Sequence, residues 1–417
     1  MNATSLRTKF VIFMAGFTVL NALMIWEVRD RIVEGYSDFA AFYTAGKILQ
    51  RGQSASLYHR DLQWQIQQEF ASKVTIRSAP LPYIRPPFEA LIFLPLAYFR
   101  YPIAFVIWML AKIAILIAFP FFLPRDARFG GISSAGTFFQ GLLWLGFFPV
   151  AFDLLQGQDS ILLLLIVTFV FWFLERRQDF ASGFTLGLGL FKFHLVVPIF
   201  LVFLLRRKLK IASGFLVAAF VVSTISLALV GWNGLSEYPR YLWRINQSPW
   251  LGGFDAYGMP NIRGLLTPLL GKGRVALSAQ MALLAGVAAG IIVVAQLWRE
   301  RSSDLQDRIG FSLCIVTTIL CSYYANSYDF TLFLLVFTLA GSVFARIKPE
   351  IHSPRRLFLI VAAVLLISPL SWVLALRIDR FSWSALVLVP LVASLAAVLR
   401  KPGTLNNHAA TSVSEAH

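Results

Sequence analysis

The sequence predicts an all-α integral membrane protein with several spanning helices. Hydrophobic residues make up 58% of the 417 residues and charged residues only 14%, and the mean hydropathy of +0.69 exceeds that of soluble globular chains. Apolar runs of about 20 residues recur along the chain, each long enough to cross a hydrocarbon layer of about 30 Å as a helix. Helices are expected because lipid offers the backbone no hydrogen-bond partners.

The first apolar run, residues 10–26, is interpreted as a retained first helix, because no small-x-small cleavage motif follows it and many further apolar runs do. A net charge of +16 would suggest nucleic acid as the partner of a soluble protein. Here the basic residues gather in short connections between apolar runs, which is the positive-inside pattern of membrane proteins. We therefore expect membrane lipid and no nucleic acid as a partner.

The positive-inside pattern also predicts which polar segments share a side of the membrane. With the basic connections 298–308, 345–356 and 400–402 inside, two polar segments, 322–329 and 377–382, fall outside. Residues 1–400 are interpreted as one polytopic transmembrane domain of roughly 10 to 12 membrane segments. Its two large outer loops are expected at about 27–87 and 232–274, and residues 401–417 are expected to form a disordered cytoplasmic tail.

The segment between the basic flanks 175–177 and 206–210 predicts a re-entrant hairpin. One straight crossing would put the flanks on opposite sides, although both favour the inside. Two arms of about 11 residues, folded back at 192–194, remove the conflict, and each arm rises only about 17 Å. Ionisable residues held at such a depth, here Lys192 and His194, indicate a functional site. The alternative is that Lys192 only extends to the outer headgroups.

The first outer loop is predicted to contain two amphipathic helices that lie on the outer surface. One covers residues 39–50 and stops at Gly52, the second begins at Asp61, and the Pro-rich segment 79–87 returns to the membrane in an extended form. The apolar run 88–99 that follows is too short for an ordinary crossing, so we interpret it as a short or re-entrant element.

Polar residues from four outer segments are expected to meet at one interface: Asp38, the 192–194 tip, residues 241–266 and residues 326–330. A carboxylate beside several cations suits an anionic, lipid-linked substrate. Cations or N–H groups stabilise a phosphate as it leaves, and a positioned carboxylate can remove the proton of an attacking hydroxyl.

Six motifs in order resemble glycosyltransferase family 87, the polyprenol-phosphate-sugar-dependent mannosyltransferases of the GT-C superfamily. The resemblance covers roughly residues 30 to 340, and the motifs are "SDFAAFYTAGKILQRGQSASLYH", "YIRPPFEALIFLPLAYF", "QGQDSILLLL", "GLGLFKFHLVVPIFLVFLLRRK", "INQS…MPNIRGLL" and "YYANSYDFTLFLL". It implies a GT-C-like helical bundle that transfers a sugar, most often mannose, with inversion from polyprenyl phosphate to a hydroxyl of a glycan or glycolipid acceptor. It also implies an active site at the outer face of a bacterial inner membrane, and no cofactor.

The resemblance also implies roles for individual residues. Asp38 matches the catalytic base of the first outer loop, and Lys192 and His194 match the lysine-containing hairpin that contacts the donor phosphate. Arg263 is expected at the phosphate too, and further substrate contacts are expected from Asn246, Asn261, Gln158 and Asp329. Two departures stand out: Ser37–Asp38 replaces a pair of adjacent acids, which argues against a bound metal, and a histidine follows the lysine where a tyrosine and a proline are common.

Other interpretations stay open at this point. Asp38 and Asp329 each precede a helical pattern and could be N-caps, worth about 1 kcal/mol. Arg263 could bind lipid headgroups, and Asp153 and Asp159 could orient an acceptor or simply be solvated at the outer rim. A transporter or flippase of lipid-linked saccharides would also place charges in broken helices, but it should show internal repeats and a polar path across the membrane. A non-catalytic scaffold of envelope assembly is the third alternative.

Overall fold

The computed structural model describes residues 3–75, 78–128, 134–247, 259–266, 277–298, 303–346, 352–366 and 383–400, and every regular element in these ranges is helical. The α-helices are α1 (Ala3–Glu27), α2 (Arg29–Val33), α3 (Phe39–Gln50), α4 (Arg60–Ala71), α5 (Ala90–Phe93), α6 (Tyr101–Ala118), α7 (Ser134–Leu143), α8 (Phe148–Gln156), α9 (Ser160–Glu175), α10 (Asp179–Leu188), α11 (Phe193–Leu205), α12 (Leu209–Gln247), α13 (Ile262–Leu266), α14 (Leu277–Leu297), α15 (Asp304–Cys321), α16 (Phe333–Arg346), α17 (His352–Leu366) and α19 (Trp383–Leu399). The predicted all-α class is confirmed.

The described residues hold 5 helical segments long and apolar enough to cross a membrane, or 6 if the bent pair Gly136–Gly146 and Phe148–Gln156 is one broken span. The five are Thr8–Glu27, Tyr101–Phe122, Asp179–Leu205, Leu209–Asn246 and Ser327–Arg346. Several other apolar helices have only 10–17 residues, so full-length spans in this part of the chain are fewer than the roughly 10 to 12 membrane segments expected. The chain is a multi-span membrane protein.

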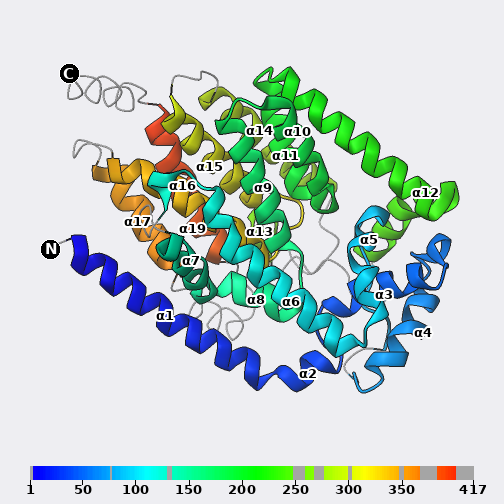
Figure 1. Ribbon diagram of the computed structural model, residues 1–417. Helices are drawn as coiled ribbons and strands as arrows, with labels where there is room; N and C mark the ends of the chain where they lie inside the picture. Colours follow the sequence, from blue (N-terminus) through cyan, green and yellow to red (C-terminus); the bar gives the residue numbers. More distant parts are fainter. Residues whose placement is uncertain are drawn as a thin grey trace.

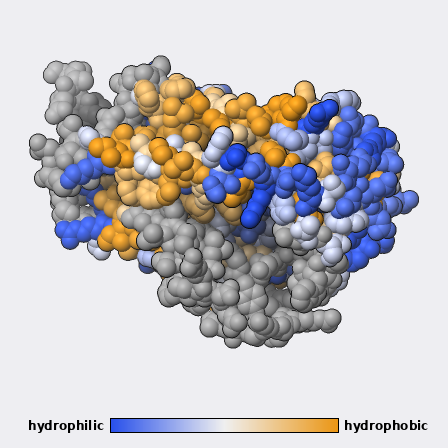
Figure 2. Space-filling model, turned by 90° about the horizontal axis from the view of Figure 1, so that it is seen from below, coloured by the Kyte–Doolittle hydropathy of each residue, from blue (hydrophilic) through white to orange (hydrophobic). Residues whose placement is uncertain are grey.

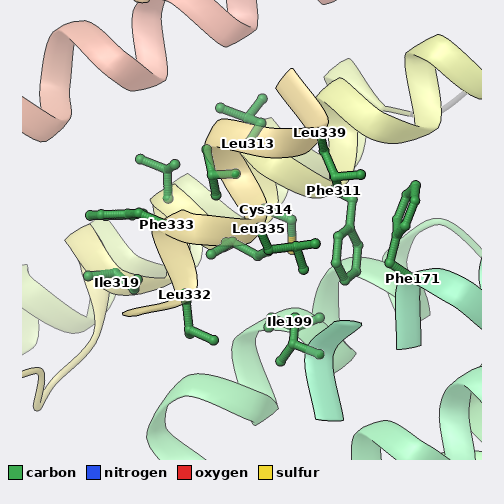
Figure 3. Close-up of a cluster of buried hydrophobic side chains, with 14 of the residues drawn as sticks. Phe171, Ile199, Phe311, Leu313, Cys314, Ile319, Leu332, Phe333, Leu335 and Leu339 are labelled. Atoms are coloured by element: carbon green, nitrogen blue, oxygen red, sulfur yellow. The ribbon is translucent and has the colours of Figure 1, made fainter. Parts of the chain in front are cut away.

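The main hydrophobic core lies where α9, α11, α15 and α16 pack together. Phe171 of α9 and Phe311 of α15 have ring centroids 5.4 Å apart, and Ile199, Cys314 and Leu335 complete the same cluster (Figure 3). Every residue of α15 from Gln306 to Cys321 is buried. In contrast, α1 runs along one edge of the bundle and is largely exposed, as a helix that faces lipid would be (Figure 1).

Charged side chains gather at both ends of this core. Near the end of α9, Arg308 lies 2.5 Å from Asp126 and 3.3 Å from Glu175, and we call this end of the bundle the opposite end. At the start of α9, Asp159 lies 2.8 Å from Lys192, and we call that end the site end.

The segment from 177 to 206 folds back on itself, as predicted. Length and composition alone would allow Asp179–Leu205 to be a single span of 27 residues, and a straight helix of that length would separate its ends by about 40 Å. Instead, Arg177 and Arg206 both reach Asp307, at 3.9 Å and 4.0 Å. The 3₁₀ turn Gly189–Lys192 forms the tip, so the predicted hairpin is confirmed and Lys192 lies at the site end.

The first loop forms a second layer over the site end. Helices α3 and α4 lie where the sequence predicts them, and Gly52 has a φ of +69° that favours glycine after α3. Helix α3 is not exposed at the surface of the protein itself. Most of α3 is buried in a second core, since it packs against the short helices of the 87–98 segment as well as α4. Hydrophilic residues gather at this end, which carries α3 and α4, and hydrophobic residues cover the middle (Figure 2).

The run 88–99 forms only short helices, Pro87–Glu89, α5 and Pro95–Tyr98, and therefore does not cross, as expected. In the second predicted outer loop, residues 232–247 are helical and continue α12 beyond a kink at Gly231, whose φ of +68° favours glycine. Residues 248–258 and 267–274 of that loop and the expected tail 401–417 lie outside the described residues.

Candidate functional site

A buried cluster of ion pairs lies at the site end. Asp159, the residue before α9, contacts Arg85 at 2.9 Å and Lys192 at 2.8 Å, and Lys192 also contacts Asp329 at 2.6 Å. Ser160 donates a 2.9 Å hydrogen bond to Asp329 and accepts one from Lys192. The four charged side chains are almost fully buried, so their charges are compensated mainly by one another.

Asp38 joins this cluster through one intermediate side chain. Gln158 donates from Nε2 to Oδ2 of Asp38 over 2.6 Å and accepts at Oε1 from Arg85 over 3.3 Å. Asp38 is half-buried and lies just before α3, but its side chain makes no capping hydrogen bond to that helix. The N-cap interpretation is therefore wrong for its carboxylate, which lies toward Gln158.

A fifth ionisable side chain, Glu89, lies beside Arg85 at 3.9 Å and accepts a hydrogen bond from the Tyr83 hydroxyl at 3.3 Å. Burial, followed by the neighbouring Asp159 carboxylate, raises the pKa of Glu89 well above its ordinary value. Burial also disfavours the ionised form of Asp159, but Arg85 and Lys192 outweigh it and hold the pKa of Asp159 below its ordinary value. Burial and the neighbouring carboxylate therefore disfavour ionisation of Glu89, whereas the two cations favour ionisation of Asp159.

Asp329 serves two purposes. One oxygen pairs with Lys192, and the other accepts a 2.8 Å hydrogen bond from the backbone of Asn326, which caps the turn that opens the last candidate span. The N-cap of this turn is Asn326, and Asp329 is the third residue of the turn, so the expectation that Asp329 is the N-cap is wrong by position, although its side chain forms the other half of a capping box.

The remaining predicted residues form a neighbouring group around Tyr323. Arg263 lies over the Tyr323 ring at 4.0 Å, donates to the Tyr323 carbonyl at 3.1 Å and contacts Asn246 at 3.5 Å. Asn261 is fully buried, where it donates to the Ser322 carbonyl at 2.8 Å and accepts from the Gly264 backbone at 2.9 Å. Asn261 therefore holds two backbone segments together.

Two adjoining cavities open at this end. A cavity of about 110 Å³ is lined by polar residues that include Asp38, Arg85 and Gln158. A larger cavity of about 350 Å³ is lined mainly by apolar side chains of α11 and α12, together with His194 and Asn246. Ile84, Arg85 and Tyr324 line both cavities, so the Arg85 side chain lies at their junction.

His194 and Lys192 differ in their relation to these cavities. His194 lines the larger cavity, and its Nε2 atom is buried with no hydrogen-bond partner among the described residues. Lys192 lines neither cavity, because Asp159, Asp329 and Ser160 surround its amine.

Three residues of this cluster were missed as site residues at the sequence level. Arg85 and Glu89 lie four residues apart in the "YIRPPFEA" segment. Two charged residues in an otherwise apolar segment that leads back to the membrane could have indicated a site there. Asp159 and Asp153 were both placed at the outer rim, where each was expected either to orient an acceptor or to be solvated. The expectation of solvation is wrong for both, since both are fully buried and ion-paired, Asp153 with Lys112 at 2.9 Å.

No group of three or more His, Cys, Asp or Glu side chains arranged to hold a metal ion occurs in the described part of the chain. Two carboxylates of the cluster are engaged by cations, Asp159 by Arg85 and Asp329 by Lys192.

The fold and the cluster define a multi-span helical membrane protein with a polar site beneath a helical cover at one end. Residues 83–322, more than half of the chain, match glycosyltransferase family 87, and the chain belongs to that family. The family implies a glycosyltransferase. Asp38 and Asp329 lie outside the matched segment. No curated protein and no solved structure matches the chain.

Proposed function

We propose that the protein transfers a sugar, mannose in the simplest case, from a polyprenyl monophosphate to a hydroxyl of a glycan or glycolipid, with inversion at the anomeric carbon. The observation that carries the proposal is the line Asp38–Gln158–Arg85, which brings a carboxylate and a guanidinium to the same small cavity. The Asp38 carboxylate can accept a proton, while the Arg85 guanidinium faces a departing anion.

In the proposed reaction the acceptor hydroxyl oxygen attacks the anomeric carbon, and the bond from that carbon to the phosphate oxygen breaks. The bonding electron pair leaves with the phosphate, and the hydroxyl proton passes to Asp38. The products are the new glycoside and free polyprenyl phosphate. The 2.6 Å hydrogen bond from Gln158 holds one carboxylate oxygen of Asp38, which fixes the carboxylate beside the cavity.

The phosphate is proposed to bind at the junction of the two cavities, where Arg85 is the cation that lines both. A guanidinium suits this task because its planar set of donors matches phosphate oxygens. His194 lines the larger cavity, and its Nε2 has no partner in the part of the chain that the structure describes. Arg263 contacts Asn246 and Tyr323, which line the same cavity.

The polyprenyl chain is proposed to occupy the larger cavity, because apolar side chains of Phe193, Leu242 and Trp243 line it. Lys192 is proposed to act at the phosphate through Asp159 and Asp329, since both carboxylates would have to release its amine before a direct contact formed. The orientation proposed is with the site end at the exterior of a bacterial inner membrane, which follows the positive-inside pattern of the basic connections.

The test uses the purified full-length protein with a panel of polyprenyl-phosphate sugars and an acceptor extract, and it measures free polyprenyl phosphate and glycosylated product. We expect release with one class of sugar and none with Asp38→Asn. If every donor of the panel binds to the folded protein but none is consumed, the proposed reaction is wrong.

The transporter alternative receives less support. A translocation path would need polar groups that continue from the site end to the opposite end. Between these ends the described residues form the apolar core around Phe171, Phe311 and Leu335 (Figure 3).

A further inference from the structure

A fully buried ion pair next to the site takes no part in the proposed reaction. Lys112 of α6 and Asp153 of α8 are 0% exposed, and Lys112 donates to the Asp153 carboxylate at 2.9 Å and to its backbone carbonyl at 2.8 Å. Neither residue lines either cavity. A buried ion pair is seldom more stabilising than an apolar pair of the same volume, so its presence calls for another reason.

The second oxygen of Asp153 supplies that reason. It accepts a 2.9 Å hydrogen bond from the backbone N–H of Ser160, the first residue of α9. The N-cap position of α9 is Asp159, an ordinary capping residue, yet its side chain makes no capping hydrogen bond. Asp153 thus accepts from the first free N–H of α9, and the Asp159 carboxylate, which makes no capping bond, pairs with Arg85 and Lys192.

Four residues of the turn between α8 and α9, residues 156–160, contact the side chains or backbone of the site. Gln156 accepts from the Asp38 backbone at 3.2 Å, Gln158 holds the Asp38 carboxylate, Asp159 holds the two cations and Ser160 holds Asp329. A small displacement of this turn would therefore displace every one of these groups together.

A second residue of α6, the helix that carries Lys112, also holds the turn. Trp108 donates from its indole to the Gly157 carbonyl at 2.9 Å, and Gly157 has a φ of +68°, which favours glycine. A Cβ added at Gly157 would lie 2.5 Å from Cβ of Phe39, the first residue of α3. Helix α6 therefore holds the turn at Gly157 and, through Asp153, at Ser160.

We propose that Lys112 and Asp153 are positioning residues for the transfer reaction, which hold the 156–160 turn so that Asp159 is free to orient Arg85 and Lys192. This inference rests on the proposed function for its effect on turnover. Its structural part, the anchoring of the turn by Asp153, does not depend on the reaction.

The test compares two double variants that both remove the buried charges. Lys112→Met with Asp153→Asn keeps an oxygen that can accept from Ser160, whereas Lys112→Met with Asp153→Leu leaves no acceptor. We expect both to fold, because neither contains an unpaired buried charge. Hydrogen exchange of the amides 158–160 should be at least about tenfold faster in the Leu variant than in the Asn variant, with the other helices unchanged.

In the transfer assay, kcat of the Leu variant should be about 10² lower than that of the Asn variant, with little change in KM for the donor. Equal exchange in the two variants, or equal kcat, would overturn the positioning role. If the Leu variant does not fold, Lys112→Met with Asp153→Ala makes the same test, because alanine also offers no acceptor to Ser160: exchange at 158–160 and kcat equal to those of the Asn variant would overturn the proposal. The two proposals can fail separately. If the wild type transfers no sugar but hydrogen exchange is still faster in the Leu variant, the proposed function is wrong and the anchoring of the turn by Asp153 is supported.

Discussion

Gln158 donates a hydrogen bond of 2.6 Å to Asp38 across 120 residues of sequence. Because Gln158 also accepts from Arg85, the two side chains proposed as base and phosphate ligand are connected by one amide. The amide has a fixed donor and a fixed acceptor, so it can face an anion on one side and a cation on the other without changing its charge. The predictions below depend on this arrangement.

Asp38→Asn should lower the transfer rate by about 10² or more while the protein stays folded and still binds the donor. Asparagine keeps the volume and one acceptor oxygen but cannot take the proton. The matched control is Glu34→Gln, four residues earlier at the end of α2, where the carboxylate contacts the exposed Lys73 at 3.4 Å. Turnover per folded molecule and donor binding are measured in both. A folded Asp38→Asn protein with near wild-type turnover would exclude Asp38 as the base.

Arg85→Lys should raise KM for the donor and reduce kcat/KM by about tenfold or more, because lysine keeps the charge but not the planar donor set. Arg51→Lys is the control, since Arg51, which follows α3, forms a partly exposed pair with Glu69 of α4 at 2.5 Å. Steady-state kinetics with a series of donor concentrations make the comparison. Unaltered kinetics in Arg85→Lys would remove Arg85 from the phosphate site.

Glu89→Gln should change how stability depends on pH. The folded-state pKa of Glu89 is raised by burial and by Asp159, so the folded protein holds a proton that the unfolded chain releases at the ordinary pKa of about 4.3. Its contribution to stability is complete below that pH and declines, by up to about 1.4 kcal/mol per pH unit, as the pH rises toward the folded-state pKa. Glutamine cannot titrate, so this decline should be missing from the variant.

Thermal unfolding of the wild type and Glu89→Gln in detergent, between pH 5 and 8, measures this difference. All other titrating groups are common to the two proteins, so the difference between the curves reports the titration of Glu89 together with its coupling to Asp159. Parallel curves would show that Glu89 is ionised in the folded protein.

Cysteines introduced at Arg177 and at Lys208 should be labelled from one side of the membrane, and a cysteine at Phe193 from the other. The reason is the hairpin, whose two ends meet at Asp307. The native thiols, Cys314 and Cys321, are buried, so background labelling by an impermeant maleimide should be low. Labelling of the two flanks from opposite faces would contradict the hairpin.

Transfer should continue after exhaustive chelation of divalent ions. The carboxylates of the cluster are already engaged by cationic side chains, Asp159 by Arg85 and Asp329 by Lys192. Activity is measured before and after treatment with a chelator. Loss of turnover that added Mg²⁺ or Mn²⁺ restores would show that a metal is required.

The meeting of many site residues at one end could be predicted, because the basic connections indicate which side of the membrane each polar segment occupies. This indication does not depend on how the helices pack. The basic connections place Asp38, Gln158, the Lys192 tip and Asp329 at one interface, and the structure brings these side chains into one chain of contacts. The partners within the cluster could not be predicted in this way. The distribution of basic residues indicates at which face of the membrane a residue lies, but it does not indicate which residues contact each other at that face.

The sequence by itself determined the helical class, the hairpin at 192–194 and the two helices of the first loop, because hydropathy, charge asymmetry and helix-stop residues are local properties of the chain. Only the tertiary structure decided that Asp153 accepts from the first N–H of α9 while Asp159 pairs with Arg85 and Lys192. In sequence the two aspartates are similar polar residues on either side of "GQ", Asp153 four residues before it and Asp159 directly after it. Both are fully buried, and in a medium of low polarity each carboxylate must find a specific donor. Which donor each one finds depends on how α6, α8 and α9 pack.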